Sequence, residues 1–431
     1  MFFINDKIKK PILGNIKLSA DDFIVEEITN NNTILEKDKF FDIIPFNEIN
    51  AAASSNSENH KFTLFILQKK NWNTIQALTE IARKLNRTFK SAGFAGTKDR
   101  LSISTQLCTL FGVNPDQVLN VNIKDIKING AWPINNKIEL GNLLGNKFTI
   151  KIKNTKVITS LNEALKNLEN LGNVFPNYFG EQRFGNRNNN YLIGIDILKG
   201  DFEEAALKFL TDTQNEFNED AKEARIKLFN EGDFADALNY FPKYLKYERL
   251  VLQHLSKLPN DYANALRKLP RSLSLLFMHS VDAFFFNKEL EIYVKNQDLI
   301  NDNKLFCNSD IFGFPDLNNI FNYSQENINK KNINKKFFAI TNLIGYNSKL
   351  NELEKELLEE FNINQEMFKT KRMPELHCKG SYRLLFSPFY NFEFKEQSKE
   401  QENNFIVFKF SLPKSSYATT FLMEFVSIEE K

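Results

Sequence analysis

The stretch SAGFAGTKDR, residues 91–100, places small residues and two glycines before a cluster of charges at Lys98, Asp99 and Arg100. A phosphate-binding P-loop is excluded, because the glycines stand at the wrong spacing before the lysine and an aspartate replaces the required hydroxyl residue. A carboxylate in a glycine-framed turn between two cations stays ionised and is a candidate nucleophile. The alternative is an ordinary surface turn with a Lys-Asp-Arg ion pair.

Two elements precede this stretch. The run FTLFIL, residues 62–67, predicts a buried strand, and NWNTIQALTEIARKL, residues 71–85, predicts a helix that begins at Asn73 or Thr74. The apolar stripe expected on that helix comprises Ile75, Leu78, Ile81, Ala82 and Leu85. The sequence therefore predicts a strand and a helix packed together just before the charged cluster.

The rest of the chain divides by its hydrophobic pattern. Residues 201–300 follow a largely helical pattern, which predicts a separate insertion. Near the end of the chain, apolar residues alternate from Ile406 to Leu412 and predict a strand that stops at Pro413. Strands are thus expected at both ends of the chain and helices in the middle.

Composition limits the classes of function. The 431 residues, 42% of them hydrophobic, can bury a sizeable core, and no apolar run is long enough to span a bilayer. The N-terminus lacks the features of a secretory signal, so a cytoplasmic location is expected. Three separated cysteines and four scattered histidines show no metal-ligand spacing. With a net charge of +2, any RNA-binding surface must be local.

Five motifs together resemble one known family. In chain order they are ADDFIVEEI at 20–28, SAGFAGTKDRLSISTQ at 91–106, NLLGNKFTI at 142–150, PNYFGEQRFG at 176–185 and FSLPKSSYATTFLMEF at 410–425. They resemble the signature elements of the TruD family of tRNA pseudouridine synthases, in the family's order. One such motif is weak evidence, but five in order are improbable by chance.

The resemblance implies roles for particular residues. Asp99 takes the place of the catalytic aspartate, and the residues expected to bind the uridine are Phe23, Asn146, Phe148 and Tyr417. From sequence alone, Phe23 is typical of a strand core and Asn146 of a left-handed turn after a glycine. Tyr417 offers a flat ring on which a flipped uracil can stack.

Two further residues are expected to contact the substrate. Lys98 is expected to support either the carboxylate or an RNA phosphate. Asn177 lies in PNYFGEQRFG, whose mix of aromatic and hydrogen-bonding side chains suits an RNA-facing surface but equally suits a locked junction between domains. Both interpretations of this run stay open.

The resemblance also implies a fold. An α/β (α+β) protein is expected, with a pseudouridine-synthase catalytic core built on a mixed, mainly antiparallel sheet. The core comprises residues 1–172 and 372–431, and a helix-rich TRUD domain is inserted at residues 173–371.

The implied function is that of an isomerase that converts uridine to pseudouridine in tRNA, at uridine 13. The nucleotide leaves the stack, and Asp99 then either attacks C1′ of the ribose or assists removal of a ribose proton. No cofactor and no metal are expected, tRNA is the expected partner, and a monomer without membrane contact is expected. The alternative is an RNA-binding or RNA-folding protein on the same scaffold without turnover.

Overall fold

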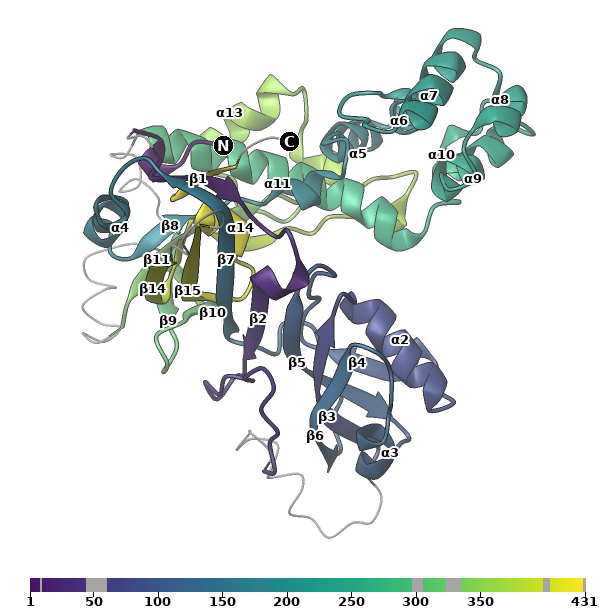
Figure 1. Ribbon diagram of the computed structural model, residues 1–431. Helices are drawn as coiled ribbons and strands as arrows, with labels where there is room; N and C mark the ends of the chain where they lie inside the picture. The colour runs from purple at the N-terminus through teal and green to yellow at the C-terminus, as the bar shows by residue number, and fades with distance from the viewer. Residues whose placement is uncertain (8–9, 44–59, 297–304, 323–334, 398–403, 429–431) are drawn as a thin grey trace. The chain divides into compact units, whose positions relative to one another are not determined.

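Runs of β-branched and aromatic residues at both ends of the chain build a large mixed sheet. The computed structural model describes residues 1–7, 10–43, 60–296, 305–322, 335–397 and 404–428. The strands of the large sheet are β1 (Ile12–Asn15), β2 (Phe23–Ile28), β3 (Phe62–Lys70), β4 (Ala92–Phe94), β5 (Ile103–Phe111), β6 (Ile126–Ile134), β7 (Gly145–Val157), β14 (Tyr390–Gln397), β15 (Phe405–Pro413) and β16 (Val426–Ile428) (Figure 1).

Strand pairing in this sheet brings distant segments together. The order is β14-β15-β7-β2-β5-β3-β6, with β1 paired to β7 and β16, and β4 paired to β5. Only the pairs β2 with β5 and β1 with β16 are parallel among the described strands. The expected mixed, mainly antiparallel sheet is therefore confirmed.

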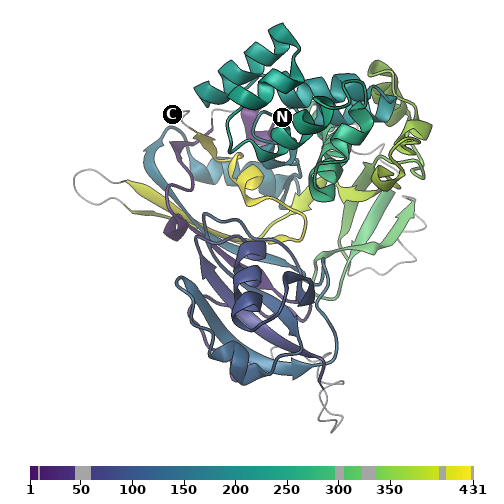
Figure 2. The ribbon, with the colours of Figure 1, turned by 90° about the vertical axis from the view of Figure 1, so that its right-hand side faces the viewer.

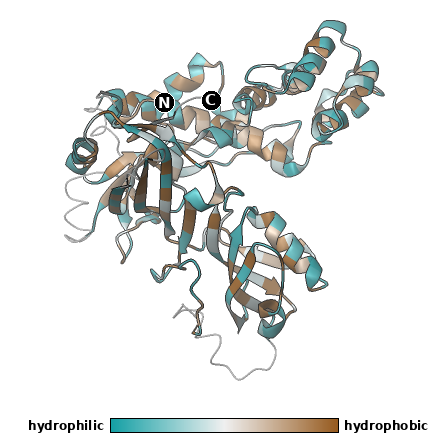
Figure 3. Cartoon of the chain, in the orientation of Figure 1, coloured by the Kyte–Doolittle hydropathy of each residue, from teal (hydrophilic) through white to brown (hydrophobic). Residues whose placement is uncertain are grey.

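Helix α2 (Thr74–Lys84) covers one face of this sheet. Asn73 caps the helix by accepting a hydrogen bond from the Gln76 amide, as expected. Leu78 and Ile81 pack onto residues of β3 and β5, and α2 lies across these strands in Figure 2. Figure 3 shows hydrophobic residues gathered on the strands and both kinds of residue along α2. The prediction that Ile75 joins the buried stripe is wrong, because its side chain is 47% exposed.

Shorter elements complete this part of the chain. They are the 3-10 helices η1 (Ile4–Lys7), η2 (Ala20–Asp22) and η3 (Phe89–Ser91), the helices α3 (Pro115–Leu119), α4 (Leu161–Asn170) and α14 (Ala418–Leu422), and the two-stranded sheet of β8 (Val174–Pro176) and β13 (Phe386–Pro388).

The middle of the chain is mainly helical, as its hydrophobic pattern predicts. Its helices are η4 (Glu181–Phe184), α5 (Asn190–Lys199), α6 (Phe202–Thr211), α7 (Glu219–Glu231), α8 (Phe234–Tyr240), α9 (Lys246–Leu255), α10 (Tyr262–Leu266), α11 (Arg271–Lys295), α13 (Glu352–Glu360), η6 (Gln365–Phe368) and η7 (Pro374–Leu376). A four-stranded sheet joins β10 (Pro315–Asn322), β9 (Leu305–Ser309), β11 (Phe337–Leu343) and β12 (Ser381–Leu384) in that order.

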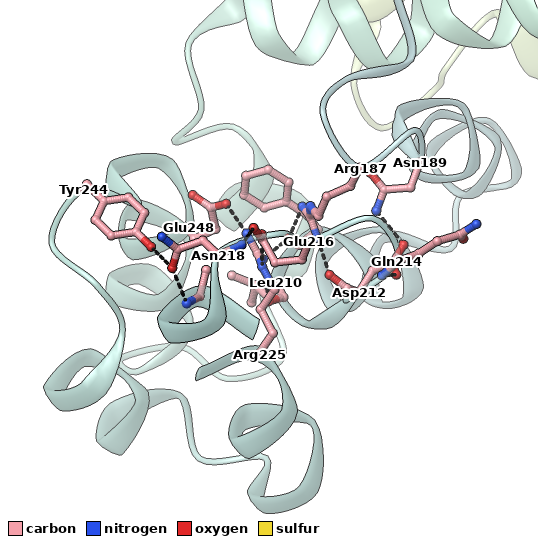
Figure 4. A network of polar contacts seen from close by, with 12 residues as sticks. Arg187, Asn189, Leu210, Asp212, Gln214, Glu216, Asn218, Arg225, Tyr244 and Glu248 are labelled. Atoms are coloured by element: carbon pink, nitrogen blue, oxygen red, sulfur yellow. Dashed lines mark hydrogen bonds and ion pairs between the residues drawn. The ribbon is translucent and has the colours of Figure 1, made fainter. Parts of the chain in front are cut away.

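A buried polar network fixes the packing of these helices. Arg187 donates from Nη1 to the carbonyl of Asp212 at 2.7 Å, and Arg225 donates from Nη1 to the carbonyl of Leu210 at 2.8 Å (Figure 4). Leu210 lies in the last turn of α6 and Asp212 is its C-cap residue, and carbonyl oxygens at the end of a helix lack partners within the helix. Arg225 also pairs with Glu248 of α9 at 2.7 Å. Two guanidinium groups thus cap α6 and join it to its neighbours.

The chain folds as two compact units. The helical unit comprises Met1–Phe2, Pro176–Asn308 and Leu317–Leu385, and the sheet unit comprises Phe3–Phe175, Ser309–Asp316 and Phe386–Lys431. The domain limits expected from the sequence, after residues 172 and 371, stay a prediction. None of the helices in the described residues has the length and apolar character required to cross a membrane.

Candidate active site

The loop that carries Asp99 joins β4 to β5 and is held by side chains around it. The Lys98 amide donates to the Thr74 hydroxyl at 2.9 Å, and the Gln106 amide group donates to the Gly96 carbonyl at 2.9 Å. The hydroxyl of Ser102 donates to the Asp99 carbonyl at 2.8 Å. Side chains from α2 and β5 therefore fix a loop that has no regular backbone pairing of its own.

A buried ammonium group provides the strongest anchor of this loop. Lys69 lies on β3 and is fully buried, and its Nζ donates to the carbonyls of Trp72, Lys98 and Asp99 at 2.6, 3.3 and 3.0 Å. Burial lowers the pKa of Lys69 to about 8, while the negative charge of Asp99 acts in the opposite direction. Lys69 thereby holds the backbone of Asp99 while its own side chain is shielded from solvent.

We expect Lys69→Met to lower kcat by about 10²-fold, because a small displacement of a reactive group has an effect of that size. KM for the substrate should change little, since the buried side chain cannot touch a bound ligand. Steady-state kinetics on a variant with an unchanged circular dichroism spectrum checks this. A folded variant with normal kcat would show that the loop keeps its geometry without Lys69.

Lys98 forms a buried ion pair. Its Nζ lies 2.9 Å from Oε2 of Glu27, and the two side chains are 6% and 0% exposed. The other carboxylate oxygen of Glu27 accepts from the Leu107 amide at 3.0 Å. The ammonium is thus directed to Glu27 and not to the neighbouring Asp99, which corrects the Lys-Asp-Arg ion pair considered from the sequence.

A different lysine pairs with Asp99. Nζ of Lys17 lies 2.5 Å from Oδ2 of Asp99, whose side chain is 43% exposed. The same ammonium sits 4.2 Å from the ring centroid of Phe23, a cation–π distance. One cation therefore joins the candidate reactive carboxylate to an expected uridine-pocket residue.

The sheet aligns the other expected pocket residues on one face. Val25 on β2 lies opposite Phe148 on β7, and Glu27 lies opposite Asn146, so all four point to the same side as Phe23, which is two residues from Val25. The rings of Phe23 and Phe148 make an edge contact at 6.2 Å. Strand pairing has brought Phe23, Asn146 and Phe148 together from segments more than 120 residues apart.

Asn146 lies within β7 in an extended backbone, so the left-handed turn considered from the sequence is wrong. Its Oδ1 is buried and accepts no hydrogen bond among the described residues. A buried acceptor without a partner is costly, and a ligand's donor would satisfy it. The geometry therefore leaves Asn146 able to bind an N–H or O–H group.

Tyr417 stands at the start of α14. Hydrogen bonds through an intermediate loop connect its segment to the loop of Asp99. The Lys414 amide donates to the Leu144 carbonyl at 2.8 Å, and the Gly141 amide donates to the Ala95 carbonyl at 2.8 Å. Nζ of Lys414 donates to the Gly141 carbonyl at 3.0 Å. Three loops of the sheet unit are thus tied together, and one of them continues from Ala95 into the turn of Asp99.

Asn177 occupies a different setting, inside the helical unit. It is 1% exposed, its Nδ2 donates to the Leu384 carbonyl at 3.0 Å, and its Oδ1 accepts from Arg383 at 3.0 Å. Nearby, Asn287 of α11 exchanges two hydrogen bonds with the backbone of Phe179. These contacts lock PNYFGEQRFG within its own unit, whereas Asp99 belongs to the sheet unit. The contact of Asn177 with RNA stays a prediction.

The sequence reasoning did not single out Lys17, Glu27 or Lys69. Glu27 lies inside the quoted ADDFIVEEI motif, but the two other residues stand in unremarkable lysine-containing segments. Their importance depends on partners 82, 71 and 30 residues away in the chain. Within the described ranges, no three histidine, cysteine, aspartate or glutamate side chains gather as metal ligands.

Comparison with known proteins gives a consistent result. Residues 6–425 match the family model described as tRNA pseudouridine synthase D (TruD). The chain is 29% identical to "Probable tRNA pseudouridine synthase D" of Methanococcoides burtonii, over 96% of this chain and 93% of that protein. It is 32% identical to the protein of the same name from Methanopyrus kandleri, over 85% and 86%. A crystal structure described as TruD from Methanosarcina mazei superposes with a TM-score of 0.74 at 27% identity, covering 99% of this chain and 95% of that one.

Proposed function

Since this chain belongs to the TruD family of tRNA pseudouridine synthases, we propose that Asp99 is the carboxylate that acts on the ribose of the target uridine. The enzyme isomerises uridine to pseudouridine in tRNA. The observation that carries the assignment of Asp99 is the Lys17 ammonium, which contacts both the carboxylate and the ring of Phe23. The carboxylate of Asp99 and the ring of Phe23, which is 3% exposed, therefore share the Lys17 ammonium as a neighbour.

The reaction exchanges one glycosidic bond for another. A uridine in folded tRNA must leave the base stack before its ribose can reach a side chain. Asp99 then attacks C1′ or assists removal of a ribose proton, and the bond from C1′ to N1 of uracil breaks. After the ring rotates, C1′ bonds to C5, which loses its proton, while N1 gains one. Reactant and product are isomers, so atoms and electrons balance without a further reactant.

We assign roles to the remaining site residues from their positions in the structure. Phe23 and Phe148 form an aromatic wall, and the unsatisfied Oδ1 of Asn146 accepts a hydrogen bond from the uridine. Lys98 fixes the loop through its buried ion pair with Glu27. We place the enzyme in the cytoplasm as a monomer that acts on uridine 13 of tRNA, and we assign an RNA-facing surface to the segment of Asn177, whose own side chain is buried.

The direct test is incubation of the purified chain with unmodified tRNA, followed by chemical mapping of pseudouridine. Conversion at a single uridine at position 13 supports the full proposal. Binding of tRNA without conversion would favour the alternative, an RNA-binding or RNA-folding protein on this scaffold.

For Tyr417, we expect replacement by alanine to weaken productive binding of the uridine by roughly 1–3 kcal/mol, the range for loss of a base–aromatic stack. Tyr417→Phe keeps the ring and should behave almost like the unsubstituted enzyme. The measurement is kcat/KM for tRNA in both variants. A large defect in the phenylalanine variant would assign the role to the hydroxyl and refute stacking.

A further inference from the structure

A groove runs along the N-terminal half of α2, beside the loop of Asp99. Its volume is about 470 Å³. Its walls include Asn71, Trp72, Ile75, Glu80 and Arg100. All of them belong to the sheet unit, and the groove is separate from the aromatic wall of Phe23 and Phe148.

The floor of the groove is apolar and partly preorganised. Trp72 is half-buried, and its indole N–H donates to the Lys124 carbonyl at 3.1 Å, which fixes the orientation of the ring. Ile75 is 47% exposed at a position where the helical stripe predicts burial. The ring of Trp72, which also packs against the core of the sheet unit, and the exposed side chain of Ile75 thus both line the groove, which suits a planar ligand.

The rim of the groove favours an anion. Nε of Arg100 donates to the Asn71 carbonyl at 3.3 Å, and within the described part of the chain the terminal nitrogens of this guanidinium make no hydrogen bond or ion pair. The one carboxylate of the rim, Glu80, is paired with Arg83 at 2.5 Å. The available charge is therefore positive and has the fork geometry that matches phosphate.

The groove is linked to Asp99 through the backbone and through the side chain of Lys69. Arg100 directly follows Asp99, and consecutive Cα atoms are about 3.8 Å apart. The buried ammonium of Lys69 binds the carbonyls of both Trp72 and Asp99. A ligand in the groove therefore lies next to a ribose held at Asp99.

We propose that this groove binds an unpaired nucleotide that neighbours the target uridine in the RNA, with its base on Trp72 and Ile75 and its phosphate at Arg100. Single-stranded RNA is recognised in this way, by stacking on aromatic rings and by charge-assisted contacts to phosphate. The inference rests on the proposed function, because it takes Asp99 as the residue that holds the target ribose. It adds a second nucleotide site, which determines how the substrate is positioned.

The chain contains two tryptophans, Trp72 and Trp132, so Trp132→Phe leaves the groove residue as the sole tryptophan. We expect unmodified tRNA to quench the emission of this variant upon binding, because a base stacks on the indole. Trp72→Phe, which keeps only Trp132, is the matched control and should respond weakly. This measurement needs no disruption of the groove itself.

Kinetics provides an independent test on the full chain. Trp72→Leu should raise KM for tRNA about tenfold, within the range for loss of one base–aromatic stack, and leave kcat at saturation close to normal. Phe111→Leu, which removes another exposed aromatic ring of the sheet unit outside the groove, should change neither value.

If the enzyme converts uridine but Trp72→Leu has normal KM and the Trp72 emission does not respond to tRNA, the inference is overturned while the proposed function stands. If the unsubstituted enzyme converts no uridine, the proposed function itself fails.

Discussion

Asp99→Asn should eliminate pseudouridine formation while the protein stays folded and still binds tRNA. The substitution keeps the shape of the side chain but removes the anionic oxygen that, in the proposed mechanism, attacks the ribose or accepts its proton. A positioned general base contributes roughly 10²- to 10⁴-fold, and loss of a nucleophile has a larger effect. Binding should persist, because phosphate contacts fix an RNA ligand largely independently of the reacting group. Single-turnover isomerisation and tRNA binding are measured on the same preparation.

Asp21→Asn is the matched control. Asp21 also pairs with a lysine, Lys70, at 2.7 Å in the same unit, but it is 61% exposed and lies outside the site. Exposed ion pairs contribute at most about 1 kcal/mol, so this variant should turn over normally. Near-normal turnover in Asp99→Asn would mean that Asp99 only forms a surface ion pair, as Asp21 does. It would then have no role in the reaction.

Lys98→Met should destabilise the sheet unit by about 3–5 kcal/mol, the usual effect of removing one partner from a buried ion pair. The carboxylate of Glu27, fully buried, would be left without its cation. Urea unfolding followed by tryptophan emission reports on this unit, because Trp72 and Trp132 both lie in it. The expected result is a clear fall in the urea midpoint.

The control for this variant is Lys127→Met, which removes a lysine paired with Asp38 at 2.7 Å. Here the two side chains are 65% and 47% exposed, so the midpoint should barely move. Equal effects of the two substitutions would mean that the buried ion pair contributes no more to stability than the exposed one. Glu27 would then be stabilised by its other contacts.

Local chemistry made part of the fold predictable from the sequence. Asn73 could be assigned as a helix cap because a cap depends only on the next three residues. Strands were expected at 62–67, from a run of apolar residues, and at 406–412, from alternation, and the structure has them at 62–70 and 405–413. The helical middle followed from the same kind of periodicity.

The site was less predictable because its contacts are not local. Nothing near Lys17 indicates that its ammonium meets Asp99, and nothing near Lys69 indicates that it binds three carbonyls. For Ile75, by contrast, the sequence predicts burial that the structure does not show. Its place on the helical stripe predicts burial, but periodicity gives the face of a helix and not whether a neighbour covers that face. The residues expected from the family's motifs, such as Asn146 and Phe148, lie on one face of the sheet because their strand register places them there.

The pairing of β7 with β15 has a consequence for synthesis of the chain on the ribosome. From Gly145 to Lys153, the strand β7 pairs with β15, whose residues emerge some 250 positions later. Until then its edge has no partner, and unpaired edges recruit other chains. The sequence GNKFTIKIKNTKV carries four lysines, and charged side chains of this kind discourage such pairing. The lysines of β7 would thus protect the nascent enzyme from aggregation before the last strand closes its sheet.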